Sequence, residues 1–423
     1  MLRLSTLDFR PSTLIERIAS AHTRDKARPS DVVWLSLDIV TARDFGGANV
    51  VKHLEREYPE SPVRDASATL FTFDCQAPAN TVGYASNQHL IRTFARRHGV
   101  RIYDVDSGIG SHVIIDEGHC IPGSTVVGTD SHLNLVGAIG ALGLGMGDGE
   151  VAFAFKTRKV WFEVPETMRV RISGSFDYPV TAKDVALSFL GTLGPAGALG
   201  MALDFTGETV DSLNLSGRIT LSSLVTEAGG VAGLIAPNIK LLEELGIADS
   251  GRSDALISAG ANANYARELE IDVSDLQPKV ALPGNPCSVV NVSEVAGTRI
   301  DSVLIGSCTN GRYEDMAVAA SILDGRKVKA GVMLRIAPAT REVYGRLLKE
   351  GVLAKLHDAG AIIVNQGCAG CAAGQVGMTG KGEVQISTGN RNFPGKQGAG
   401  ETYLSSPVVA AYSAIYGEIR VPE

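Results

Sequence analysis

The 423-residue sequence lacks features that would place it in several large classes of protein. It contains no continuous run of about 18 apolar residues, so we expect no membrane-spanning helix. Its N-terminus, MLRLSTLDFR, has neither an apolar core nor a small-residue cleavage site, which predicts a cytoplasmic rather than a secreted protein. No block rich in Lys and Arg stands out and the formal net charge is −7, which argues against binding DNA through a basic face.

The residues that are present form the composition of a soluble globular chain, 44% hydrophobic and 20% charged. Strand-like and helix-like periodicities alternate throughout, which predicts an α/β fold. Residues 31–41 are typical of a strand, and residues 272–290 are typical of a linker. Patterns typical of helices occur at 86–99, 219–235 and 340–359. We place soft boundaries that give three α/β domains, at residues 1–166, 167–283 and 284–423.

Three of the six cysteines lie in polar segments that follow predicted strands. Cys308 follows one strand, Cys368-x-x-Cys371 follows a second, and Asn390-Arg391 follows a third. Because ligands bind beyond the carboxyl ends of strands in open α/β sheets, we expect these segments to converge on one crevice. Three thiolates suit an iron–sulfur cluster with one open iron better than a closed zinc site. Zinc and a simple redox pair stay open as alternatives at this point.

A carboxylate and two imidazoles form a second group of candidate residues in the first domain. Asp130-Ser131-His132 follows a predicted strand, and His112 lies earlier in the same domain. A carboxylate beside an imidazole is typical of an acid/base or orienting unit. A capped turn with a satisfied histidine is the alternative interpretation of either segment taken alone.

Glu227 is a candidate because its surroundings in the sequence are apolar. It lies four residues after Ser223 on the predicted helix 219–235, so the two side chains share a helix face. A carboxylate buried on such a helix must be paired, protonated or bound to a ligand. The sequence therefore favours a functional role for Glu227.

Taken together, these motifs resemble those of the aconitase superfamily. The resemblance is carried, in the expected order over essentially the whole chain, by Gly128-Thr129-Asp130-Ser131-His132, Gly306-Ser307-Cys308-Thr309-Asn310-Gly311, Cys368-x-x-Cys371 and Asn390-Arg391-Asn392-Phe393. The length and layout are similar to the large subunit of 3-isopropylmalate dehydratase type enzymes. The resemblance implies three α/β domains around a [4Fe-4S] cluster bound by Cys308, Cys368 and Cys371, with one iron open to substrate.

The same resemblance implies a reaction and a set of site residues. The reaction is stereospecific hydration and dehydration of a hydroxy di- or tricarboxylic acid, such as an isopropylmalate-, methylmalate- or citrate-like substrate. Asp130, His112 and His132 would lie in the active site, and Glu227 would hydrogen-bond the iron-bound oxygen. The residues that hold the substrate or the cluster environment would include Ser131, Ser223, Asn390, Arg391 and Lys396.

The resemblance also predicts a protein partner. Family members carry a fourth, swivelling domain with a serine base and carboxylate-binding arginines, and nothing after Asn390 in this sequence provides it. In the two-subunit members this domain is a separate small protein. We therefore expect a small subunit that completes the site in trans as part of a hetero-oligomer.

Three positions depart from the family pattern. Asp74-Cys75 stands where the family usually has Asp-His, and a cysteine is a poorer acid–base match at neutral pH than that histidine. Ser223 stands in place of an asparagine, and Lys396 stands in place of an arginine and so loses its bidentate geometry. These departures favour a divergent dehydratase with a non-standard substrate. If Cys75 were a fourth cluster ligand, the catalytic iron would no longer be open to substrate.

The sequence therefore predicts a [4Fe-4S]-dependent hydro-lyase large subunit that acts on a small hydroxy acid. It leaves open whether the enzyme re-adds water, as an isomerase does. The alternative is a cluster-bearing regulatory or binding protein without turnover. The negative net charge argues against this alternative if the ligand is RNA.

Overall fold

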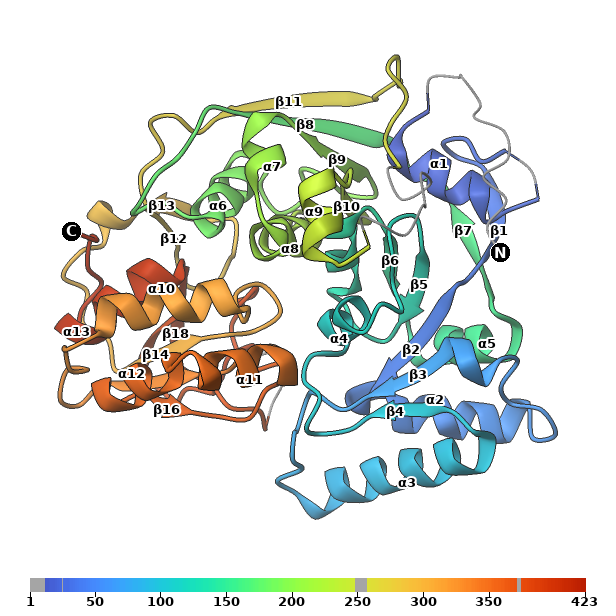
Figure 1. The fold of residues 1–423 in the computed structure, drawn as a ribbon, viewed down its shortest axis with the longest axis horizontal. Coiled ribbons are helices and arrows are strands. Elements are labelled where there is room, and N and C mark those ends of the chain that lie inside the picture. The colour runs from blue at the N-terminus through green and yellow to red at the C-terminus, as the bar shows by residue number, and fades with distance from the viewer. Residues whose placement is uncertain (1–11, 25, 248–256, 371–373) are drawn as a thin grey trace.

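The computed structural model describes residues 12–24, 26–247, 257–370 and 374–423. Within these residues the strands form four sheets, and the three larger sheets lie in separate lobes (Figure 1). None of the helices in this described part combines the length and the hydrophobicity that crossing a lipid bilayer requires. Strands and helices alternate and most neighbouring strands are parallel, so the predicted α/β class is confirmed.

A five-stranded parallel sheet organises the N-terminal lobe, in the order β4-β3-β2-β5-β6. Its strands are β2 (Ile39–Arg43), β3 (Thr69–Thr72), β4 (Arg101–Tyr103), β5 (Thr125–Gly128) and β6 (Leu142–Gly145). Around it lie α1 (Leu14–Ala21), α2 (Asp44–Glu57), α3 (Val82–His98), α4 (Gly110–Asp116), α5 (Asp148–Thr157) and the 3-10 helix η2 (Leu133–Ile139). Apolar side chains of α2, α3 and α5 form one core cluster, and those of α4 and η2 form another.

Helix α3 shows how local sequence signals determine an element of this lobe. Thr81 caps its first turn through a hydrogen bond from the backbone N–H of Tyr84. Gly99 ends it in a left-handed conformation, with φ at +68°, which glycine adopts without steric cost. The predicted helix 86–99 is confirmed, with a start a few residues earlier.

The predicted strand 31–41 is wrong in its continuity, because the chain changes sheets at Leu37 and Asp38. The backbone N–H of Leu37 bonds to Arg158, and that of Asp38 bonds to Thr125 in β5. Residues before the break form β1 (Val32–Ser36), which pairs antiparallel with β7 (Lys159–Glu163) in a two-stranded ribbon. Residues after the break form β2, at the centre of the parallel sheet.

The second lobe is built on a four-stranded parallel sheet in the order β10-β9-β8-β11. Its strands are β8 (Thr167–Ser173), β9 (Ala202–Thr206), β10 (Ala232–Ile235) and β11 (Arg267–Asp272). Its helices are α6 (Ala182–Leu193), α7 (Glu208–Ser212), α8 (Leu215–Ser223) and α9 (Ile239–Glu244).

The predicted helix 219–235 is wrong over its second half. Helix α8 ends at Ser223, a 3-10 turn η3 (Leu224–Ala228) follows, and Gly229 adopts φ of +82°. The chain then enters β10, which is buried along its whole length. A short apolar run fits a buried strand as well as a buried helix, so periodicity alone does not separate the two.

The third lobe contains a seven-stranded mixed sheet in the order β13-β12-β18-β17-β14-β15-β16. Its strands are β12 (Lys279–Ala281), β13 (Val289–Asn291), β14 (Ser302–Ile305), β15 (Met333–Ile336), β16 (Ile362–Ile363), β17 (Val384–Ser387) and β18 (Glu401–Ser405). Its helices are α10 (Tyr313–Leu323), α11 (Arg341–Lys349), α12 (Val352–Ala359) and α13 (Pro407–Tyr416).

Two expectations for this lobe need correction. The segment 272–290, predicted to be a linker, contributes β12 and the start of β13 to the sheet. The predicted helix 340–359 is two helices, because Gly351 takes a left-handed conformation with φ of +73° between α11 and α12. The strands that precede the cysteine segments, β14 and β16, run parallel to β15 between them.

Candidate active site

The carboxyl ends of three neighbouring strands of the N-terminal sheet bring two predicted carboxylates together. Asp74 follows β3 and Asp130 follows β5, on the two sides of β2. Arg43, the last residue of β2, donates from Nε to Asp74 Oδ1 at 2.8 Å and from Nη1 to Asp130 Oδ1 at 3.1 Å. Sequence reasoning missed Arg43, since only the sheet order places it between two carboxylates that are far apart in the chain.

Although they share one cation, the two carboxylates have opposite pKa shifts. Burial raises the pKa of Asp74 to about 7, and the attraction of Arg43 offsets only part of that effect. Burial acts in the same sense on Asp130, but Arg43 and His132 outweigh it and hold its pKa below the ordinary value. Asp130 also accepts from the backbone N–H of His132 at 3.0 Å and from Ser111 Oγ at 3.1 Å. Near neutral pH, Asp130 is therefore ionised while Asp74 is able to hold a proton.

Glu227 joins residues from three separate segments. Its Oε1 lies 2.9 Å from His132 Nε2 and accepts from Arg391 Nε at 2.7 Å. Arg391 Nη1 also donates to Ser131 Oγ at 3.1 Å. Burial raises the pKa of Glu227, but the hydrogen bonds and charges of His132 and Arg391 outweigh it, so the pKa lies below the ordinary value. The expectation that a buried Glu227 is paired is confirmed.

His112 connects the first lobe to the loop that carries Cys308. It lies on α4, is fully buried, and its Nε2 is 2.9 Å from the carbonyl oxygen of Cys308. Burial lowers the pKa of His112 to about 4, so the imidazole is neutral at physiological pH. With Nε2 donating to that carbonyl, Nδ1 is left as an acceptor.

The cysteine-bearing loops lie beside these carboxylates. Cys308 is 2% exposed and Cys368 is 3% exposed. Cys308 Sγ donates to Asn390 Oδ1 at 3.3 Å, and the backbone N–H of Cys368 donates to the backbone carbonyl oxygen of Asp74 at 2.9 Å. The predicted convergence of the strand ends is therefore seen for Cys308 and Asn390, whereas Cys371 lies outside the described residues.

The donor set of this region fits an iron–sulfur cluster. Thiolates are the ligands that such clusters prefer, and Cys308 and Cys368 are both shielded from solvent. Among the described residues, Arg43 Nη2, His112 Nδ1 and Asn390 Nδ2 are buried without a hydrogen-bond partner. Buried polar atoms normally have a partner, and Arg43 and Asn390 both line the cavity described next, so their unpartnered atoms are consistent with a polar group bound at this site.

A cavity of about 460 Å³ opens next to the cysteine loops, within the usual size range for small-molecule sites. Three cationic side chains line it, those of Arg43, Arg391 and Lys396. Cys75 lines it as well, and its Sγ donates to Asp74 Oδ1 at 3.3 Å. Burial raises the pKa of the Cys75 thiol well above its ordinary value, so Cys75 is a thiol at neutral pH.

The structure does not bring every predicted residue to this cavity. Ser131, His132 and Asn390 line it. The Ser223 hydroxyl instead donates to the carbonyl of Thr220 within its own helix, at 3.2 Å, and Ser223 is not among the lining residues.

Lys183 is a further residue that sequence reasoning missed. It lies on α6, is fully buried, and its Nζ donates to the carbonyls of Thr388 at 2.9 Å and Gly389 at 2.8 Å. Its Nζ also approaches Thr309 Oγ1 at 3.4 Å. Burial lowers the pKa of Lys183 to about 7. Lys183 thus ties the loop after β14 to the loop after β17, directly before Asn390.

Comparison with known proteins finds one family over nearly the whole chain. The profile of the aconitase family (aconitate hydratase) matches residues 16–417. The large subunit 1 of 3-isopropylmalate dehydratase from Methanopyrus kandleri is 43% identical over 413 residues, 97% of this chain and 98% of that protein. The homoaconitase large subunit of Thermus thermophilus is 39% identical over 414 residues, 97% of each chain.

A likeness to a solved structure extends to the fold alone. Aconitase X of Thermococcus kodakaraensis, in its holo form, superposes with a TM-score of 0.51 at 13% sequence identity. The match covers 92% of this chain and 88% of that one.

Proposed function

The chain belongs to the aconitase family of hydro-lyases, and we propose that it is the cluster-bearing large subunit of an enzyme that removes water from, and adds water to, a hydroxy di- or tricarboxylic acid. The observation that carries this proposal is the cavity in which Arg43, Arg391 and Lys396 lie beside the Cys308 loop. A planar guanidinium binds a carboxylate in two-point fashion, and an ammonium binds it as a point charge. Arg43 and Arg391 also bind Asp130 and Glu227, and Lys396 adds a third cation, so the cavity keeps an excess of positive charge that suits a substrate carrying carboxylates.

Proteins of the aconitase family bind a [4Fe-4S] cluster, and we propose Cys308, Cys368 and Cys371 as its three ligands. When bound, the cluster supplies a Lewis acid through an iron that no protein ligand occupies. The fit of Cys308 and Cys368 to such a group, and the unpartnered atoms around them, support this proposal.

The residues around the cavity would manage the protons of the reaction. With its pKa near 7, Asp74 is placed to hold a proton for the departing hydroxyl, and the Cys75 thiol hydrogen-bonded to it occupies the family's histidine position. The ionised Glu227 orients His132 and fixes Arg391 for substrate carboxylate. Neutral His112 offers Nδ1 as an acceptor.

We further propose that a small subunit completes the site, because the relatives reported above are named large subunits. By the family resemblance, that subunit supplies the base that removes the carbon-bound proton. The division of this chain into three domains near residues 166 and 284 stays a prediction.

The substrate lies among those that the relatives' names indicate, an isopropylmalate-type or a homoaconitate-type acid. The decisive experiment reconstitutes the cluster anaerobically and adds the small subunit encoded in the same genome. It follows the appearance of alkene absorbance with 3-isopropylmalate, citrate and methylmalate, and the loss of that absorbance with homoaconitate. Turnover on one acid, lost in Arg391→Lys, supports the proposal. An intact cluster with no turnover on any acid, together with tight RNA or protein binding, favours the regulatory alternative.

A further inference from the structure

Both tryptophans of the sequence are exposed on the antiparallel ribbon formed by β1 and β7. Trp34 and Trp161 lie directly opposite each other in the ribbon, and they are 57% and 58% exposed. Val32 is 67% exposed, whereas Val160 and Phe162, which alternate with Trp161 along β7, are buried. Tryptophan is enriched at the energetic centres of protein interfaces, so an exposed pair on one ribbon face indicates a surface that another molecule covers.

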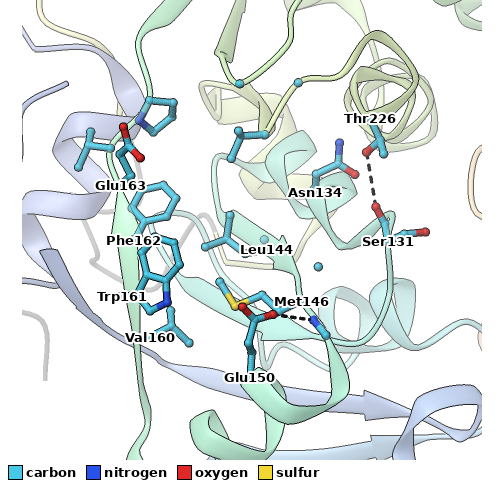
Figure 2. A pocket seen from close by; sticks show the side chains of 18 of the residues that line it. Ser131, Asn134, Leu144, Met146, Glu150, Val160, Trp161, Phe162, Glu163 and Thr226 are labelled. Atoms are coloured by element: carbon cyan, nitrogen blue, oxygen red, sulfur yellow. Dashed lines mark hydrogen bonds between the residues drawn. The ribbon is translucent and has the colours of Figure 1, made fainter. Parts of the chain in front are cut away.

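The ribbon borders an open groove of about 1280 Å³, which we call the tryptophan groove. Leu144 and Met146, from β6 and the residue after it, also line the groove. Figure 2 shows Trp161 on one side of this pocket, Ser131 on the opposite side, and Leu144 and Met146 between them. The groove is lined mainly by apolar side chains, and Leu199, which lines it from the second lobe, is 73% exposed.

The tryptophan groove adjoins the candidate active site. Thr129 and Ser131 line both the groove and the cavity of about 460 Å³. Ser131 Oγ accepts a hydrogen bond from Arg391 in the cavity, and its carbonyl accepts one from Thr226 Oγ1 on the groove side, at 3.5 Å. A molecule seated in the groove therefore lies next to Ser131, which contacts the cavity residue Arg391.

The charges of the groove select between possible occupants. The charged residues that line it are Glu150, Glu163 and Glu166, and no Lys or Arg occurs among the described lining residues. The whole chain carries a net charge of −7. An acidic groove on an acidic chain disfavours a second copy of the same chain and favours a basic partner segment.

We propose that the tryptophan groove is the docking surface of the small subunit, which inserts an apolar segment that carries at least one Lys or Arg. This inference rests on the proposed function, because that function requires a small subunit to complete the site. It adds where the subunit docks: on the β1–β7 ribbon, from which it reaches the cavity past Ser131.

The two tryptophans make a direct test of this surface possible, because they are the only ones in the sequence. The full chain is labelled with 5-fluorotryptophan, and its two ¹⁹F resonances are assigned with Trp34→Phe and Trp161→Phe. The unlabelled small subunit encoded in the same genome is then titrated in. We expect both resonances to shift and saturate at the same stoichiometry as turnover, and solvent exposure of both rings to fall.

Matched variants test the energetics of docking. We expect Trp34→Ala to weaken binding of the small subunit at least tenfold, because an aromatic anchor is lost. Glu163→Lys should weaken binding as well and reduce its dependence on salt. Leu348→Ala removes an equally exposed apolar side chain from α11, and Glu60→Lys reverses an exposed charge elsewhere; both should bind as the unaltered chain does.

The outcomes separate the docking proposal from the proposed function. If the small subunit restores turnover while both resonances stay unchanged and Trp34→Ala binds normally, the docking proposal is overturned and the function stands. If both resonances shift but no hydroxy acid turns over, docking is supported and the proposed function fails. Resonances that shift with the concentration of this chain alone, or on removal of residues 2–11, would identify another occupant and overturn the docking proposal.

Discussion

The carboxylate of Asp44 determines where Asp74 and Cys75 lie, and its removal is the perturbation we develop first. Asp44 is the first residue of α2 and is almost fully buried. Its Oδ1 accepts from the backbone N–H groups of Asp74 at 3.2 Å and Cys75 at 3.0 Å, and its Oδ2 accepts from Gln88 Nε2 at 3.0 Å. We predict that Asp44→Ala destabilises the protein and loosens the segment that carries the candidate proton donor.

The magnitude follows from the groups that lose a partner. Asp44→Ala leaves the buried backbone N–H groups of Asp74 and Cys75 without an acceptor, at about 1–3 kcal/mol each, and also removes the longer contact of the half-buried Gln76 N–H with Oδ2, at 3.4 Å, which adds less. Gln88 keeps its second hydrogen bond, to the carbonyl of Gln76 at 2.9 Å, and adds little. We therefore expect the free energy of unfolding to fall by about 4 kcal/mol. Asp44→Asn retains Oδ1 as an acceptor but loses the charge, so its free energy of unfolding should fall by about 2 kcal/mol.

The assay is urea unfolding followed by far-ultraviolet circular dichroism, with hydrogen exchange of the Asp74 and Cys75 amides as the local readout. The matched control is Asp31→Ala, which removes a carboxylate that accepts from the backbone N–H of Arg28 at 2.9 Å in an exposed turn. This control should lower the free energy of unfolding by less than about 1 kcal/mol. If Asp44→Ala costs no more than the control, or if the two amides exchange no faster, the reasoning is refuted.

The remaining predictions concern the cluster, the buried histidine and the Glu227 pair. In anaerobically purified protein, Cys308→Ala or Cys368→Ala should abolish bound iron and sulfide, whereas Cys75→Ala should retain them, as measured by metal analysis and EPR. Equal loss in all three variants would place Cys75 among the ligands. The pKa of His112 is about 4 in the folded chain and about 6.5 when unfolded, so the free energy of unfolding should fall by up to about 3 kcal/mol as pH falls from 6.5 toward 4. In urea unfolding, His112→Asn should remove this dependence on pH. An unchanged dependence would contradict the pKa shift. Glu227→Gln should lower kcat by about 100-fold or more with a smaller change in KM, because the proton path loses its carboxylate while Arg391 remains. In steady-state kinetics, a change in KM alone would show that Glu227 acts only in binding.

Local sequence signals sufficed wherever the determining contacts are local. The amphipathic pattern and Gly99 predicted helix α3 and its end, since a left-handed glycine acts within a few residues, whereas the start capped by Thr81 lies a few residues before the predicted one. The same signals predicted that Cys308 and Asn390 follow strands. They did not predict the break between β1 and β2 or the strand β10, because both depend on hydrogen bonds to segments distant in the chain.

What the sequence by itself determined is therefore the α/β alternation, the family, and the chemical type of most candidate residues, because residue identity and short-range periodicity encode them. Only the tertiary structure decided which charges meet. The order β3-β2-β5 places Arg43 between Asp74 and Asp130, and packing of α6 against the third lobe buries Lys183 behind the Cys308 loop. Pairing of β1 with β7 likewise leaves both tryptophans exposed beside Ser131. Such contacts join residues separated by dozens to hundreds of positions, and their energies depend on burial that no local pattern specifies.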